Sequence, residues 1–243
     1  MIATHWRPPD APLRTSAATA HIVAFVAVVV LAQSLRGVLP VGGQYVLKAT
    51  AVFVAVTLFS FGQLHRHHPF TRFGAANQIT TLRAIVVALI AGLIGEPRFP
   101  MVAEAAGGAS LIVTALDGVD GWLARRARIV SAFGARFDME VDALLILVLS
   151  ILVWRFDKAG GWVVASGLLR YVFVAAGSIW PWLAAPLSPS RRRQTVCVLQ
   201  IASLTLAIFP AVAPPLSTAL AAGALAALAG SFLVDTVWLW RAR

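Results

Sequence analysis

Residues 111–142 are the most informative stretch of the chain; they read LIVTALDGVDGWLARRARIVSAFGARFDMEVD. They connect two apolar segments, predicted as helices over residues 100–123 and 136–155, through a short basic turn. Half of the ten acidic residues of the chain fall within 26 positions here: Asp117, Asp120, Asp138, Glu140 and Asp142. A short connection makes neighbouring helices antiparallel, so the stretch predicts a helical hairpin with acidic side chains near its turn.

The composition is that of a membrane protein. Of the 243 residues, 59% are hydrophobic and 12% are charged, about half the charged fraction of a soluble domain. This excludes an ordinary soluble enzyme, a disordered tail and a soluble nucleic-acid binder. A helix that crosses a bilayer needs about 20 apolar residues. Eight segments qualify and predict an all-α, polytopic membrane helix bundle: 19–35, 44–63, 80–96, 100–123, 136–155, 161–184, 195–213 and 216–239.

The basic residues set the orientation, since Lys and Arg accumulate on the cytoplasmic side. With the N-terminus inside, 14 of the 20 Lys and Arg residues lie on inner segments and five on outer ones. We therefore expect a multi-pass protein of an inner or plasma membrane with both termini cytoplasmic. The net charge of +10 then reflects topology and attraction to anionic headgroups, and we expect no nucleic-acid partner. Residues 19–32 also fit a cleaved signal-peptide core, which would leave the later helices unchanged.

Four of the clustered acids are spaced to act together. Asp117 and Asp120 are three residues apart, and Asp138 and Asp142 are four apart, so each pair shares a helix face. The helical hairpin brings both pairs to one pocket at the inner membrane boundary, whereas Glu140 points elsewhere. Four carboxylates repel one another unless a cation lies among them, and oxygen ligands without His or Cys suit Mg²⁺ or Mn²⁺.

Small and basic residues flank these acids. Gly121 follows Asp120, and Gly134 precedes Asp138 by four residues. Because glycine in a helix interior costs about 1 kcal/mol relative to alanine, the two glycines suggest a ligand that approaches the backbone closely. Arg125, one turn after Gly121, could bind a phosphate. Near the other end of the chain, Asp235 is expected to make a polar contact between helices.

The acidic stretch resembles the signature of the CDP-alcohol phosphotransferase family, in the residues Asp117-Gly-Val-Asp120-Gly121-Trp-Leu-Ala124-Arg125 and, after eight more, Gly134, Asp138 and Asp142. Upstream, Asn77-Gln-Ile-Thr80-Thr-Leu-Arg83 resembles the entry to the first core helix of that family. The resemblance covers roughly residues 75–240. It implies a six-helix catalytic core over residues 75–243, preceded by an extension, residues 1–74, with two transmembrane helices.

Members of this family transfer a phosphatidyl or similar group from a CDP-linked donor to an alcohol and release CMP. The resemblance implies that two divalent cations, Mg²⁺ or Mn²⁺, are held by Asp117, Asp120, Asp138 and Asp142, and that Asp142 is also the general base. It assigns the nucleotide and headgroup contacts to Gly121, Arg125, Ser131, Gly134, Asn77, Thr80 and Arg83. The implied partners are CDP-diacylglycerol or a related CDP-linked donor, a small alcohol acceptor, membrane lipids and a second copy in a homodimer.

Two other classes of membrane protein also use clustered acidic residues. An intramembrane prenyltransferase also binds pyrophosphate through aspartates and Mg²⁺, but it usually has two widely separated Asp-rich motifs. A non-enzymatic divalent-cation transporter would place acids near the membrane midplane, on broken helices in related halves. The single compact motif at the inner boundary favours the transferase.

Overall fold

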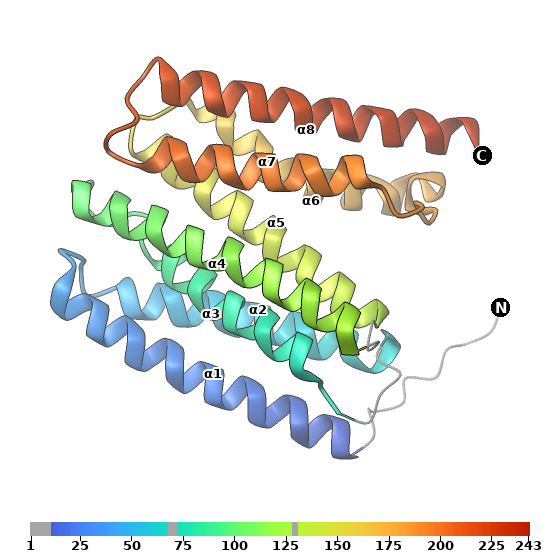
Figure 1. The fold of residues 1–243 in the computed structure, drawn as a ribbon, viewed down its shortest axis with the longest axis horizontal. Helices are drawn as coiled ribbons and strands as arrows, with labels where there is room; N and C mark the ends of the chain where they lie inside the picture. Colours follow the sequence, from blue (N-terminus) through green and yellow to red (C-terminus); the bar gives the residue numbers. More distant parts are fainter. Residues whose placement is uncertain (1–10, 68–71, 128–130) are drawn as a thin grey trace. The chain divides into compact units, whose positions relative to one another are not determined.

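The computed structural model describes residues 11–67, 72–127 and 131–243, and within these ranges the side chains of all residues except 65–67 and 119–127. This described part is all-α, with eight α-helices, two short 3₁₀-helices and no strand (Figure 1). The α-helices are α1 (Ala11–Val38), α2 (Tyr45–His67), α3 (Ala75–Gly92), α4 (Pro100–Ala127), α5 (Ala132–Arg155), α6 (Ala165–Ile179), α7 (Arg191–Ile208) and α8 (Leu216–Arg241). The 3₁₀-helices are η1 (Gly161–Val164) and η2 (Pro181–Ala184).

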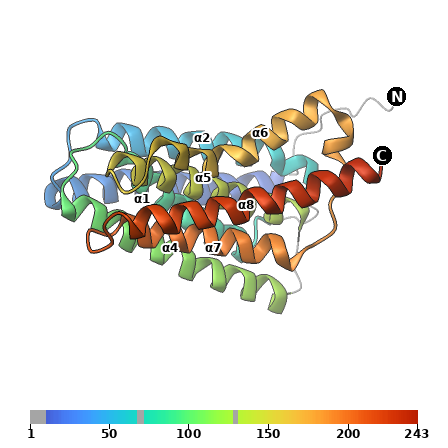
Figure 2. The same cartoon turned by 90° about the horizontal axis from the view of Figure 1, so that it is seen from above.

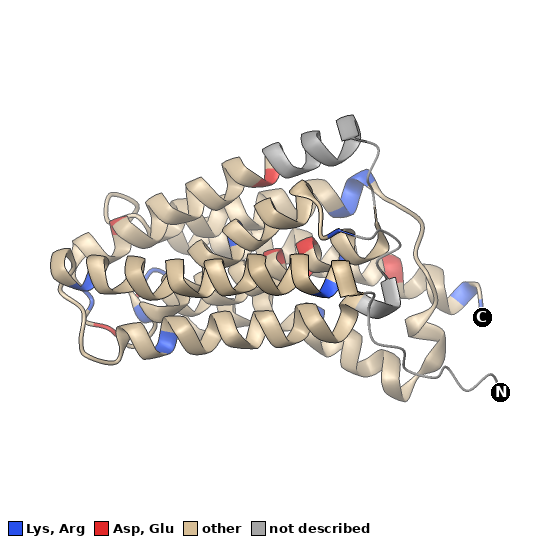
Figure 3. Cartoon of the chain, turned by 90° about the horizontal axis from the view of Figure 1, so that it is seen from below, with Lys and Arg blue, Asp and Glu red and all other residues tan. Residues whose placement is uncertain are grey.

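Six described segments are long and apolar enough to cross a membrane: α1, α2, α3, α4, η1 with α6, and α8. These helices indicate a multi-pass membrane protein, and Figure 3 shows the long uncharged stretches along them. Each of the eight predicted segments overlaps an α-helix. Only six of them meet the length and hydropathy criteria for a membrane span among the described residues, so the expectation of eight spans is not confirmed. Every 18-residue window of α5 and of α7 carries at least three charged residues. In α5 these include the acids of the predicted site.

Three predicted helices end earlier than expected. The segment 195–213 ends at Ile208, five residues early. The segment 161–184 is broken because Pro181 lacks an N–H group and disfavours a helical residue before it. Trp180 is accordingly extended, with φ −113° and ψ 94°, and separates α6 from η2. The segment predicted to run to Glu96 ends at Gly92, before a turn in which Gly95 has a φ of +82°.

The chain packs as two compact units, and α4 and α5 run unbroken through both. Unit 1 comprises Met1–Gly92 and Leu111–Val141; unit 2 comprises Leu93–Ser110 and Asp142–Arg243. Unit 1 therefore groups α1 and α2 with α3 and with parts of α4 and α5. The division into residues 1–74 and 75–243 remains a prediction.

Within unit 1, α3 packs against both α1 and α2. Gly92 makes the close approach to α2 possible, since a Cβ atom there would lie 2.8 Å from the ring of Tyr45. The hydroxyl of Tyr45 donates to the carbonyl of Leu89 over 3.2 Å. Aromatic rings connect the start of α3 to α5, with ring centroids 6.0 Å apart for Phe73 and Phe133. These contacts fix α3, which carries part of the candidate site.

Within unit 2, α7 and α8 lie side by side (Figure 2). Helix α6 approaches α5 closely at Gly167, where a Cβ atom would lie 2.3 Å from the Cα of Leu147. Lys158, in the turn after α5, caps the end of α7: its Nζ donates to the carbonyls of Phe209, Pro210 and Val212 over 2.9, 3.3 and 2.8 Å. The lysine ammonium has three N–H donors, so each donor can bind one of these three carbonyls.

Candidate active site

Arg83 joins two of the predicted metal ligands. Its side chain, on α3, is 1% exposed, and its Nη1 lies 2.9 Å from the Oδ1 of Asp117 on α4. The same nitrogen donates to the Oδ1 of Asp138 on α5. Both aspartate side chains are about one-third exposed. A buried guanidinium between two carboxylates neutralises part of their repulsion, so three helices meet here around a partly neutralised acidic group.

Asp142 adds a third carboxylate one helical turn beyond Asp138. Helix α5 runs unbroken past both residues, and the spacing of four keeps them on one face. One carboxylate oxygen from each of Asp117, Asp138 and Asp142 lies within 4.8 Å of the others. We call these three residues the aspartate cluster. Glu140 lies outside this cluster, in agreement with the prediction that it faces elsewhere.

The start of α5 explains two further predicted residues. Ser131 immediately precedes the helix, and its Oγ accepts a hydrogen bond of 2.9 Å from the backbone N–H of Gly134. This is the bond of an N-cap serine to the third helical residue. A Cβ atom on Gly134 would lie 2.8 Å from the Oδ1 of Asn77 and 3.2 Å from the Oγ of Ser131. Glycine at this position therefore lets α3 reach the first turn of α5.

The remaining predicted residues are less clearly placed. Thr80 is buried on α3, and its hydroxyl donates to the carbonyl of Ala76 over 3.2 Å. The side chains of Asp120, Gly121 and Arg125 lie outside the described residues, although the backbone of all three belongs to α4. The structure thus brings together Asn77, Arg83, Asp117, Ser131, Gly134, Asp138 and Asp142.

Sequence reasoning missed a thiol beside this cluster. The Sγ of Cys197, on α7, lies 4.0 Å from the Oδ2 of Asp142. The two residues are 55 positions apart, and a lone cysteine in an apolar helix gives no signal of such a contact. The prediction for Asp235 is confirmed: it binds Arg192 over 2.5 Å and Arg193 over 3.1 Å, which joins α8 to α7.

The aspartate cluster fits a divalent cation. It presents carboxylate oxygens, the ligand type that Mg²⁺ and Mn²⁺ prefer. Three carboxylates face one guanidinium, so the group retains excess negative charge that a cation would neutralise. The side chains of Asp117 and Asp138 are about one-third exposed, so the cluster is not sealed from solvent.

The sequence profile of the CDP-alcohol phosphatidyltransferase family matches residues 73–234, which is 162 of the 243 residues. The chain belongs to this family. The match begins just before α3, ends within α8 and includes every residue of the aspartate cluster. Searches of curated proteins and of solved structures gave no match to the chain.

Membership of the CDP-alcohol phosphatidyltransferase family establishes the class of reaction. The enzymes of this family transfer a phosphate-linked group from a CDP-alcohol, and the resemblance read from the acidic signature is confirmed. The matched family is neither a prenyltransferase family nor a family of cation transporters, the two alternatives described above. Helices α1 and α2 lie outside the matched residues.

Proposed function

We propose that the protein transfers a substituted phosphate group, in the first instance phosphatidyl, from CDP-diacylglycerol to a small alcohol and releases CMP. The observation that carries this proposal is the aspartate cluster with Arg83, inside the family match. Its carboxylates suit cation binding, and its guanidinium can contact a phosphate once a cation takes its place between Asp117 and Asp138.

Asp117, Asp120 and Asp138 would hold two divalent cations, with Asp142 completing the site. Bound cations would neutralise negative charge on the pyrophosphate. Asp142 is proposed as general base because the resemblance to the family implies this role, and α5 holds it one turn from Asp138. Its carboxylate takes the proton of the acceptor hydroxyl while the alcohol oxygen bonds to the phosphorus of the transferred group. The P–O bond to CMP breaks, and CMP leaves with the electron pair.

The nucleotide would lie against the first turn of α5 and the signature part of α4. Gly121 would give it access to the backbone, Gly134 would line the region beside Asn77, and Arg125 would bind its phosphates. Ser131, Asn77, Thr80 and Arg83 would line the same region. The distribution of basic residues supports an active site on the cytoplasmic side, at the inner boundary of the membrane.

The test is release of CMP from CDP-diacylglycerol by the purified protein in vesicles with Mn²⁺. Acceptors to be screened include glycerol 3-phosphate, inositol phosphate, serine, choline and ethanolamine, and a soluble CDP-alcohol serves as alternative donor. Asp142→Asn is expected to lower kcat by about 100-fold or more, within the range for loss of a general base. Glu140→Gln is the matched control: it removes a carboxylate from the same helix and is expected to retain activity.

Two results would contradict the proposal. Full activity in Asp142→Asn would exclude this residue as the base. Failure of every donor and acceptor pair to yield CMP, together with Mn²⁺ flux across the vesicle membrane, would favour the transporter instead.

A further inference from the structure

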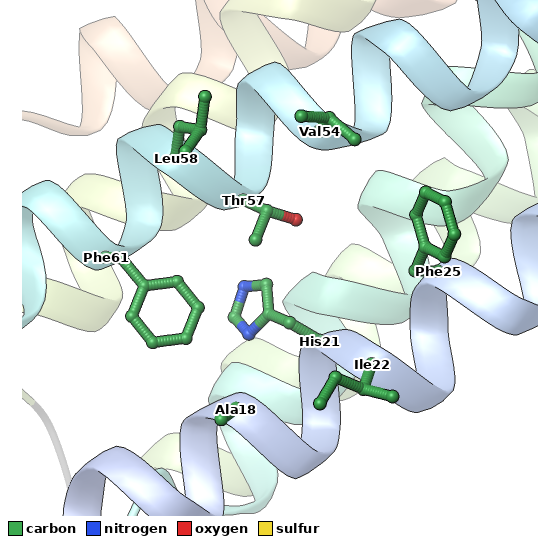
Figure 4. A pocket seen from close by; sticks show the side chains of 8 residues that line it. All are labelled: Ala18, His21, Ile22, Phe25, Val54, Thr57, Leu58 and Phe61. Atoms are coloured by element: carbon green, nitrogen blue, oxygen red, sulfur yellow. The ribbon is translucent and has the colours of Figure 1, made fainter.

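A cavity of about 270 Å³ opens between α1 and α2, outside the family match. Figure 4 shows its walls, which are apolar except at two side chains, His21 of α1 and Thr57 of α2. The His21 ring points across the gap towards α2, and Phe61 lies beside it. Small-molecule pockets usually span about 300–1,000 Å³. The size and lining of this cavity therefore suit a slender hydrocarbon group.

His21 offers a hydrogen-bond acceptor at this cavity. The side chain is 3% exposed, and its Nδ1 lies 2.9 Å from the carbonyl oxygen of Ala17. A carbonyl oxygen can only accept, so Nδ1 carries the proton. A second proton would leave an unpaired cation among apolar side chains, which is costly. The ring is therefore neutral, and its Nε2 presents a lone pair.

Two buried polar atoms here lack hydrogen-bond partners among the described residues: the Nε2 of His21 and the Oγ1 of Thr57. Buried polar atoms are nearly always hydrogen-bonded, and leaving one unsatisfied costs about 1–3 kcal/mol. The rings of Phe61 and Phe73 flank His21, with centroids 5.2 and 5.4 Å from its own. These rings fill the space around the imidazole without satisfying it, whereas a hydroxyl group of a bound molecule would supply the missing partner.

The depth of the site limits what that molecule can be. The predicted span of α1 begins at residue 19, so we expect His21 to lie about 3 Å inside the hydrocarbon edge, given a rise of 1.5 Å per residue. At this level a membrane lipid changes from hydrocarbon to polar groups. A bound molecule with a polar group at one end and a hydrocarbon body would therefore place the polar group at His21 and the hydrocarbon in the cavity.

We propose that the groove between α1 and α2 binds a lipid alcohol, a molecule with one hydroxyl group at the end of a hydrocarbon body. Its hydroxyl donates to the Nε2 of His21 and accepts from the hydroxyl of Thr57, while its hydrocarbon fills the apolar cavity. An ester carbonyl can only accept and leaves Nε2 unsatisfied. A carboxylate or phosphate can only accept as well, and would also carry charge into the cavity.

This binding site is independent of the proposed transferase reaction. The ring centroids of His21 and Phe137 are 6.4 Å apart, and Phe137 precedes Asp138 on α5. The Phe137 ring therefore lies beside His21, one residue before Asp138, and all three residues belong to unit 1. Binding of the lipid alcohol can be measured without any turnover.

The test is photolabelling of the protein in vesicles of dioleoylphosphatidylcholine, a lipid without a hydroxyl group. The probe is hexadecanol with a diazirine in its chain, and labelled peptides of α1 and α2 are identified by mass spectrometry. Unmodified hexadecanol is expected to compete with the probe, whereas its methyl ether, which cannot donate, is expected to compete at least threefold more weakly. Equal competition by the ether would overturn the proposal, because any hydrocarbon chain would then suffice.

Two variants probe the polar pair separately. His21→Phe and Thr57→Val nearly conserve volume, and each is expected to weaken probe binding about threefold to tenfold, the equivalent of one hydrogen bond. The matched control is Thr50→Val on the same helix, whose hydroxyl already donates to the carbonyl of Val46 over 2.8 Å. Unchanged labelling in Thr57→Val would refute the proposed binding of a lipid alcohol, even if His21→Phe fails to fold. Labelling that falls as protein density rises would mean that a second copy covers the groove, and would also refute it.

Discussion

Replacement of Arg83 by methionine tests how the aspartate cluster is held together. Methionine keeps most of the aliphatic volume but removes the guanidinium that binds Asp117 over 2.9 Å and also binds Asp138. The two carboxylates would then face each other without a cation. We expect the variant to be less stable than the wild type, chiefly because of this uncompensated negative charge.

The size of the effect follows from burial and distance. At an effective dielectric constant of about 20, two charges 4 Å apart interact by about 4 kcal/mol. Removal of one partner of a buried pair typically costs about 3–5 kcal/mol. Asp117 and Asp138 are 37% and 36% exposed, so solvent screening puts the expected loss at the low end, about 3 kcal/mol. For a chain of this size that corresponds to a fall in Tm of about 6–12 °C.

Mn²⁺ provides a second and more specific readout. In the wild type an incoming cation competes with Arg83 for the oxygens of Asp117 and Asp138, whereas in Arg83→Met it does not. Millimolar Mn²⁺ is therefore expected to raise the Tm of the variant more than that of the wild type. A residue that only fills space in the core would give no such difference.

Unfolding can be followed with a thiol-reactive fluorophore, because Cys197 is the single cysteine of the chain. The control is Arg98→Met, which breaks an ion pair with Asp157 in which both side chains are exposed, by 54% and 79%. Such a pair contributes about 0–1 kcal/mol. If Arg83→Met lowers the Tm no more than Arg98→Met does, or if Mn²⁺ raises both Tm values equally, Arg83 does not neutralise the aspartate cluster.

Four further outcomes are expected. Lys158→Met should lower the Tm by an amount equivalent to about 2 kcal/mol, since three carbonyls lose a charged donor. Burial lowers the pKa of Lys158 from its ordinary value, so the native protein releases this proton at a lower pH than the unfolded chain does. The Tm of the wild type should therefore rise relative to that of the variant as the pH increases between those two pKa values. Gly134→Ala should cost about 1–3 kcal/mol in thermal unfolding by crowding Asn77, whereas Gly223→Ala, with open space around it, should be neutral or stabilising. Chelation of divalent cations by EDTA should abolish equilibrium binding of CDP-diacylglycerol, and not merely its turnover.

The helices were predictable because their signal is local. Each predicted apolar segment overlaps a helix, but α1 begins at Ala11, eight residues before the predicted start of that span. Hydropathy marks where a helix enters hydrocarbon, and the helix itself continues through residues such as Arg14 and Thr15 that belong outside it. Charge likewise explains why α5 and α7 do not qualify as spans. The packing of α1 and α2 on α3 was not predictable, since it depends on matched shapes at positions such as Gly92 and Tyr45.

The candidate site was predictable where spacing along one helix determines geometry. The interval of four residues placed Asp138 and Asp142 on one face of α5, and the few residues between the two predicted helices favoured a place for Asp117 near them. The ion pairs of Arg83 depend on contacts across 34 and 55 positions, which no local pattern specifies. Ser131 was predicted only by resemblance, as a nucleotide contact, and in the structure it caps α5. A serine three residues before a helical glycine is a local signal that could have predicted the cap.

The charge balance of the aspartate cluster bears on the order of events in the proposed reaction. Asp117, Asp138 and Asp142 supply three negative charges and Arg83 supplies one positive charge, so the described part of the cluster has a net charge of about −2 when all three acids are ionised. The pyrophosphate of a CDP-linked donor is itself negative and would be repelled by this group. Two divalent cations would reverse the sign of the local charge and make the same cluster attract phosphate. Cations that bind before the donor or together with it would remove this repulsion, which is why chelation should prevent the donor from binding at all.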